Sequence, residues 1–173
     1  MKIVFFGVLF VALVLLLGCA SQPPAGQVPT GKLVLLVSDE EANIGDFSSV
    51  NVTFDSARIF FEDENKGFKE MPLNGAKADL AQLIGENTVP VGEFQLEAGS
   101  YSKIELEVQS IEAVLISGDA ADVKIPSEKL IVTKPFTIDA NTETRFVFDI
   151  QVVKKGQLYE YNLLPNIAKS GVV

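Results

Sequence analysis

The sequence has no histidine and no tryptophan, and it has a single cysteine, Cys19. Without histidine or a free thiol, neither a Ser-His-Asp nor a Cys-His catalytic arrangement can form. The nitrogen and sulfur ligands that are usual for zinc are also missing, and a lone cysteine excludes a disulfide within the chain. We therefore predict that the protein is not an enzyme. A hydrolase that uses carboxylates alone is the remaining enzymatic alternative, and a cleft with two facing carboxylates of shifted pKa would favour it.

Positive charge is scarce as well. Lys and Arg number 14 against 23 Asp and Glu, which gives a formal net charge of −9 at pH 7. Such an acidic chain repels nucleic-acid phosphates and anionic lipid headgroups, so we expect no nucleic-acid partner and no electrostatic docking to a membrane. The glycines are scattered singly through predicted turns, and no glycine-rich phosphate-binding loop occurs.

One long apolar run is present, from residue 3 to residue 17, between Lys2 and Cys19. A helix of this length reaches about 22 Å, short of the ~30 Å hydrocarbon core of a bilayer. A basic start, a short apolar region and a small residue before the cleavage point are typical of a secretory signal peptide. We predict that residues 1–18 are a lipoprotein signal peptide and that Cys19 carries the lipid. An uncleaved anchor helix is the alternative.

Residues 19–30 are predicted to be the lipidated cysteine and a flexible tether, because their Pro, Gly and small polar residues cannot build a core. The remaining residues, 31–173, are enough for one domain with its own core. The expected location is the extracytoplasmic face of the cell membrane, with the lipid on Cys19 as the contact to the membrane.

The domain shows the two-residue alternation of half-buried strands. Apolar and polar residues alternate in the segment 103–109, and the segment 144–152 places Phe146, Phe148, Ile150 and Val152 on one face. Strands with one buried and one solvent-exposed face favour antiparallel pairing. Turn signals about every 8–14 residues favour a sandwich. We predict an all-β fold, an antiparallel β-sandwich of transthyretin-like or immunoglobulin-like architecture.

The alternation changes phase within two of the predicted strands. Between residues 50 and 61 the apolar residues switch parity, which predicts a β-bulge near Asp55-Ser56. A similar switch is predicted beyond Ser110. The residues of 63–67 predict a hairpin loop, and helical spacing of apolar residues predicts one short helix or helical turn at 79–84.

Five short motifs occur in the order found in a known family. They are Gly31–Asp39, Ala78–Leu80, Leu96–Tyr101, Phe148–Ile150 and Tyr161–Ile167. On these motifs the chain resembles domain-of-unknown-function family 4382, which is found in bacterial and archaeal surface lipoproteins. Glu40 stands where that family often has a proline. The resemblance implies a surface location and a sandwich fold, and it implies no activity because none is established for the family.

Calcium is the one metal that the residue types permit. The loop 38–46 gathers four carboxylates and an amide, which are the hard oxygen donors that Ca²⁺ prefers. Asp39, Glu41 and Asn43 alternate as at the start of an EF-hand loop, although no glutamate closes the motif. We predict a weak calcium site at Asp39, Glu41, Asn43 and Asp46, with no other cofactor. The alternative is a solvated acidic loop.

Two further motifs allow glycan-related interpretations. Asn51-Val52-Thr53 is a formal N-glycosylation acceptor that we expect to be unmodified. Tyr159 and Tyr161 share a strand face and would form a small sugar-binding platform if exposed, but a core or sheet-edge role is favoured for them and for Tyr101.

The sequence thus predicts a lipid-anchored extracytoplasmic module that binds a protein, a glycan or an envelope component through loops at one end of the sandwich. One alternative is a structural envelope lipoprotein without a specific ligand. The other, less favoured, is the carboxylate-based hydrolase.

Overall fold

The computed structural model describes residues 28–40, 43–156 and 160–173. The predicted signal peptide at 1–18, Cys19 and most of the tether lie outside the described residues. Within these ranges the chain forms ten strands and three short 3₁₀ turns, so the all-β prediction is confirmed. The strands are β1 (Thr30–Asp39), β2 (Phe47–Phe61), β3 (Phe68–Asp79), β4 (Val89–Glu97), β5 (Gly99–Leu115), β6 (Ala120–Lys124), β7 (Lys129–Ile138), β8 (Glu143–Lys154), β9 (Glu160–Pro165) and β10 (Gly171–Val172).

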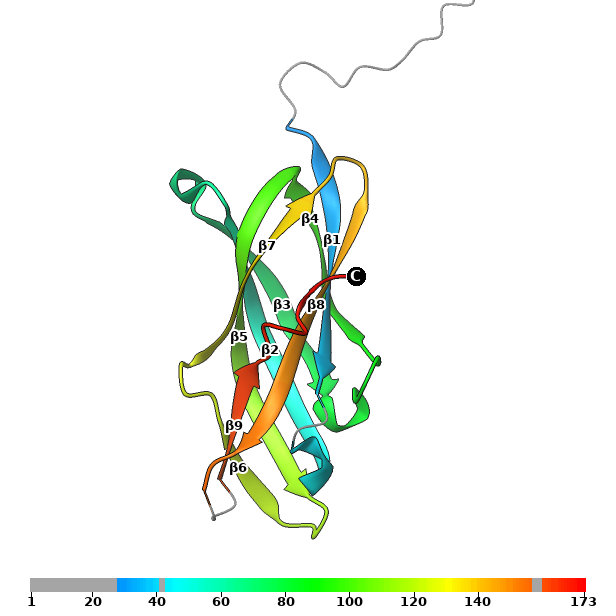
Figure 1. The fold of residues 1–173 in the computed structure, drawn as a ribbon, viewed down its shortest axis with the longest axis vertical. Coiled ribbons are helices and arrows are strands. Elements are labelled where there is room, and N and C mark those ends of the chain that lie inside the picture. The colour runs from blue at the N-terminus through cyan, green and yellow to red at the C-terminus, as the bar shows by residue number, and fades with distance from the viewer. Residues whose placement is uncertain (1–27, 41–42, 157–159) are drawn as a thin grey trace, which may run out of the picture.

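All described strands belong to one sheet with the order β3-β2-β5-β6-β9-β8-β1-β4, from which β7 branches at β5 and β10 at β8. The two ends of this path, β3 and β4, lie next to each other, so the sheet is nearly closed and barrel-like around a common core. Figure 1 shows the long strands running along the longest axis of the molecule. The predicted division into two separate sheets is not confirmed, because β6 joins the two halves.

The prediction of purely antiparallel pairing is wrong for two strand pairs. β1 runs parallel to β8, and β6 runs parallel to β9. The reason is visible in β1, which is buried on both faces: Leu33, Leu35 and Val37 face the main core, while Val34 and Leu36 form a second cluster with Val147. Strands buried on both faces are typical of parallel pairing.

The predicted alternation is confirmed in β8, where Phe146, Phe148, Ile150 and Val152 are all buried in the main core. The predicted bulge in β2 is also confirmed, since the register shifts between Phe54 and Ser56. Along β5 the register against β2 shifts at several points. Beyond Ser110 it does shift, opposite Val114 and Leu115, but the extra residue is Ser48 on β2. The extra residues on β5 itself are Ser102 and Gln109.

The turns agree with their sequence signals, with one correction. The predicted hairpin loop at 63–67 is present, with a 3₁₀ turn at Glu64–Lys66 and a positive φ of 66° at Gly67. The short helix or helical turn predicted at 79–84 is a single 3₁₀ turn, Leu80–Gln82. Asp79 caps its start by accepting from the Ala81 N–H, and the Leu83 N–H closes it by donating to the Leu80 carbonyl. In the described part of the chain, no helix is long and apolar enough to cross a membrane.

Candidate functional site

Two buried aspartates, Asp39 and Asp149, lie on neighbouring strands where β1 ends beside its parallel neighbour β8. The register pairs Ser38 with Asp149 and Asp39 with Ile150. The Asp39 N–H donates to the Leu83 carbonyl at 3.3 Å, which ties the end of β1 to the η3 turn (Leu80–Gln82). Asp39 is 1% exposed and Asp149 is 5% exposed, a degree of burial that is rare for carboxylates.

The carboxylate oxygens of this pair are poorly satisfied. Asp149 Oδ2 accepts a hydrogen bond from the Ser38 hydroxyl at 2.5 Å, and the Asp149 N–H donates to the Ser170 hydroxyl oxygen at 3.0 Å. Both oxygens of Asp39 and Oδ1 of Asp149 have no hydrogen-bond partner. Among the described residues, these three are the buried side-chain polar atoms without a partner. Native proteins leave few such groups, and each one calls for an explanation.

Burial changes the protonation of both groups. Burial first, and then the negative charges of Asp149 and Glu40, together raise the pKa of Asp39 to about 8, while the Glu40 N–H opposes the shift. Desolvation also raises the pKa of Asp149, and the charge of Glu40 adds to this. Hydrogen bonds from Ser38 and Asn166 and the charge of Lys169 hold the pKa of Asp149 lower than burial alone would. Asp39 is therefore mostly protonated at neutral pH unless a counter-charge is present.

The pair borders a cavity that opens to solvent. Asp39, Glu40, Gly85, Asp149 and Lys169 line a space of about 280 Å³. An adjoining space of about 420 Å³ shares the last three of these residues and extends past Arg145 and Glu86 to Val173 at the C-terminus. No aromatic residue lines either space. The lining carries charge, and three unpartnered acceptor oxygens are buried next to it, so the arrangement suits a cationic or hydrogen-bond-donating ligand.

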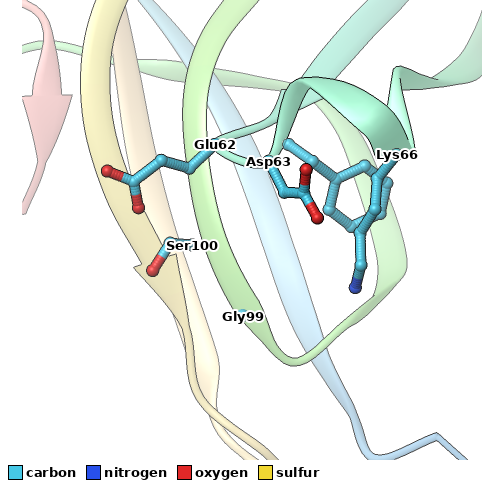
Figure 2. Close-up of a pocket in the computed structure, with 6 residues that line it drawn as sticks. Glu62, Asp63, Lys66, Gly99 and Ser100 are labelled. Atoms are coloured by element: carbon cyan, nitrogen blue, oxygen red, sulfur yellow. The ribbon is translucent and has the colours of Figure 1, made fainter.

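A second hollow, of about 480 Å³, lies beside the hairpin loop at 63–67. Figure 2 shows Glu62 and Ser100 on one side of it and Asp63 and Lys66 on the other. Asp63 accepts from both the backbone and the side-chain nitrogen of Asn65. Lys66 lies 5.1 Å from the centre of the Phe61 ring. Because its charged groups are exposed and engaged in turn contacts, this hollow is a weaker candidate than the aspartate pair.

The predicted calcium ligands have separate roles in the structure. Asp39 is one of the buried pair, and Glu41 lies outside the described residues. Asn43 Oδ1 accepts from the Lys154 N–H at 2.9 Å, and Asp46 Oδ2 accepts from the Tyr161 hydroxyl at 2.9 Å. In the described ranges, no three Asp, Glu, His or Cys residues converge as a metal cluster. The four-residue loop site stays a prediction.

The tyrosines that are described lie in the core. Tyr161 is 2% exposed and packs edge-on against Phe47 at 4.6 Å between ring centres. Tyr101 is fully buried between Phe61 and Phe136. The core role favoured for both is confirmed, and Tyr159 lies outside the described residues. Asn51 is half-buried on β2, where it pairs with Asp79 on β3 and Glu112 on β5.

Sequence reasoning did not identify Asp149 as a site residue. Its position in 144–152 has the parity of the wet face, so the residue looks like an ordinary solvated carboxylate. Its burial comes from β1, β10 and the Asn166–Ser170 segment, which are distant in the sequence. The signal that was available is that Asp39 follows the apolar run Leu33–Val37 after a single serine.

Comparison with known proteins gives one family and little else. A family model described as "Domain of unknown function (DUF4382)" matches residues 30–165. No curated protein matches. A solved structure of a leucine-rich repeat protein from Bacteroides thetaiotaomicron is similar at 15% identity and a TM-score of 0.30, over 77% of this chain. The matched part spans only 14% of that protein's chain, and a likeness at this TM-score carries no argument about fold or function.

Proposed function

We propose that this chain, which belongs to DUF4382, a family of domains of unknown function, is a lipid-anchored binding module on the extracytoplasmic face of the cell membrane. Its role is the non-enzymatic binding of an envelope component, a protein or a glycan. The observation that carries the binding role is the buried aspartate pair, with three unpartnered oxygens beside an open cavity.

The pair favours binding over a purely structural role. A buried polar group without a partner costs about 1–3 kcal/mol, and a buried charge costs more. A pair of well-packed apolar residues at Asp39 and Asp149 would avoid that cost. A protein that only fills space in the envelope gains nothing from the arrangement, whereas perturbed carboxyl groups beside a cavity are typical of functional sites.

The same pair keeps a carboxylate-based hydrolase as a second candidate. Asp39, protonated at neutral pH, has the protonation state of a general acid, and Asp149 would be the second carboxyl group. Binding is preferred because the three oxygens are enclosed, and because the lining offers no aromatic ring for a sugar to stack on.

The anchor rests on the sequence. A lipid on Cys19 and a tether to residue 30 lead directly into β1, which starts near one end of the long axis (Figure 1). That end would face the membrane. Asp39 lies at the other end of β1, about 30 Å further from the membrane at 3.3 Å per residue, where the cavity is accessible to envelope components.

We also infer that the barrel-like sheet is a relative of transthyretin-like and immunoglobulin-like sandwiches. Among the described residues, the strand pairings that join the group β2, β3, β5 and β7 to the group β1, β4, β8 and β9 are those of β6, two residue pairs with β5 and three with β9. In addition, the Tyr101 hydroxyl donates to the Glu97 carbonyl four residues earlier at 2.7 Å. This contact is similar to the tyrosine corner of such sandwiches.

The test is retention of envelope material by the full chain, purified in detergent and immobilised. We expect the wild type and the matched control Glu112→Gln to retain the same component. Glu112 is exposed, and it lies on β5, which pairs with neither β1 nor β8. Asp39→Asn and Asp149→Asn should lose it. Equal retention by all four proteins would show that binding does not use the aspartate pair, and retention by none would leave the structural role. If the wild type releases new reducing ends from envelope glycans and Asp149→Asn does not, the result would instead support the hydrolase.

A further inference from the structure

We propose that Asp39 and Asp149 together hold a hard divalent cation of the calcium class. This inference rests on the proposed function, because it names a ligand for the same cavity. It differs from the acidic-loop site predicted from residues 38–46: the two share only Asp39, and the second carboxylate comes from β8, 110 positions further along the chain.

The first argument is the supply of unused oxygen donors. Both oxygens of Asp39 and Oδ1 of Asp149 are buried and accept no hydrogen bond from the protein. Both side chains are more than nine-tenths buried and line one cavity. The Ser38 hydroxyl, already 2.5 Å from Asp149 Oδ2, lies next to them as a neutral oxygen. Carboxylate, hydroxyl and backbone carbonyl oxygens are the ligands that Ca²⁺ prefers.

The second argument is the balance of charge. Glu40 acts on both aspartates as a third negative charge, and its Oε2 accepts from the Asn166 side-chain nitrogen. Lys169 is the cationic residue of the smaller cavity, and it is exposed. In the adjoining space, Arg145 is paired with Glu143 at 3.3 Å. Carboxylates are therefore in excess around the pair, and a bound cation would remove the repulsion between them.

The third argument selects the class of metal. The whole chain has no histidine, and its one cysteine is Cys19, so a nitrogen- or sulfur-preferring metal has no suitable ligands here. Mg²⁺ demands near-ideal octahedral geometry and keeps several waters, which suits an enclosed pair of aspartates poorly. Two carboxylates completed by neutral oxygens match the weak calcium sites of extracellular modules, with dissociation constants of about 10⁻⁴ to 10⁻³ M.

The experiment is calorimetric titration of the full chain with CaCl₂, in detergent and physiological NaCl, after removal of divalent ions with a chelator. We expect binding of one Ca²⁺ with a dissociation constant near 1 mM or below, and a higher melting temperature in Ca²⁺ than in chelator. Asp39→Asn and Asp149→Asn should each weaken binding at least tenfold. Glu112→Gln, which removes the same charge from a distant strand, should bind as the wild type does.

Lys169 provides a further discriminating variant. If a metal ion occupies the site, Lys169→Gln should tighten Ca²⁺ binding severalfold, because it removes a positive charge from the cavity. If Lys169 is itself the counter-charge, the variant should lower the melting temperature and leave no calcium binding. The proposal is overturned by that second result, by no binding heat and no melting shift in the wild type, or by unchanged binding in both aspartate variants.

The outcome is separable from that of the proposed function. If the wild type retains an envelope component in chelator and Asp39→Asn does not, the binding role is supported and the cation is not required for it. Calcium binding without any retained component would support the metal site and contradict the wider role.

Discussion

Asp39 is the residue whose environment departs most from its sequence context. In the folded chain its pKa is raised to about 8, mainly by burial, whereas its ordinary value is 3.8. Between these values the folded state holds a proton that the unfolded state has released. Stability is therefore greatest below about pH 4 as far as this group is concerned, and falls as the pH rises toward 8.

We predict that, in chelator, the free energy of unfolding decreases from pH 5 to pH 8 by at most about 1.4 kcal/mol per pH unit. Asp149, whose pKa is also raised by burial, shares this pH dependence. Urea denaturation at several pH values measures it. Asp39→Asn should flatten the curve, and Glu112→Gln should not. A wild-type curve that rises over this range would show that Asp39 is ionised in the folded state.

Tyr101 illustrates a residue whose role follows from a single contact. Its ring is fully buried, and its hydroxyl donates to the Glu97 carbonyl at 2.7 Å across the turn between β4 and β5. Tyr101→Phe keeps the ring and leaves that carbonyl without its partner. We predict a loss of about 1–3 kcal/mol in the free energy of unfolding.

Tyr161→Phe is the matched control for this measurement. Its hydroxyl donates to Asp46, an exposed side chain that can turn to water instead. Its loss should be smaller than that of Tyr101→Phe. Equal losses would mean that the contact across the β4–β5 turn has no special weight.

The start of β1 depends on a close approach of two backbones. A side chain at Gly31 would place its Cβ 2.2 Å from the Asp139 carbonyl oxygen and 2.8 Å from Ile138. Lys32 also donates its N–H to the Thr142 carbonyl at 2.8 Å, which holds the turn after β7 against β1. Only glycine fits this approach without moving the backbone.

We therefore predict that Gly31→Ala lowers the free energy of unfolding by about 1–3 kcal/mol, as measured by thermal or urea denaturation. Gly45→Ala is the control, because a Cβ there meets nothing within 4 Å. A neutral Gly31→Ala would contradict the close packing of β1 against the β7–β8 turn.

The strands differ in how far the sequence predicted them. β8 and the bulge in β2 were predictable because apolar and polar residues alternate along a half-buried strand, and a bulge interrupts this alternation. β1 was predicted as a strand but not as a parallel one. An apolar run predicts burial, but it does not identify the strand that pairs with it or the direction of that strand. The meeting of Asp39 with Asp149 was not predictable, because it depends on the register of two strands 110 positions apart. Local patterns do not encode such a register.

The whole molecule combines a nearly closed sheet with one site that packing alone does not explain. The three unpartnered oxygens lie at the end of β1 that is distant from the tether. If the lipid anchor is correct, the domain stands on the membrane by one end and presents this cavity away from it. The location of the protein therefore decides which ligands the cavity can meet.

Mass spectrometry of the native protein, purified from the membrane fraction of its host, tests this location. We predict that the first residue is Cys19 and that its thiol carries a diacylglycerol, with residues 1–18 removed. A native protein that retains Met1 and a free Cys19 thiol would contradict the anchor and the envelope role inferred from it.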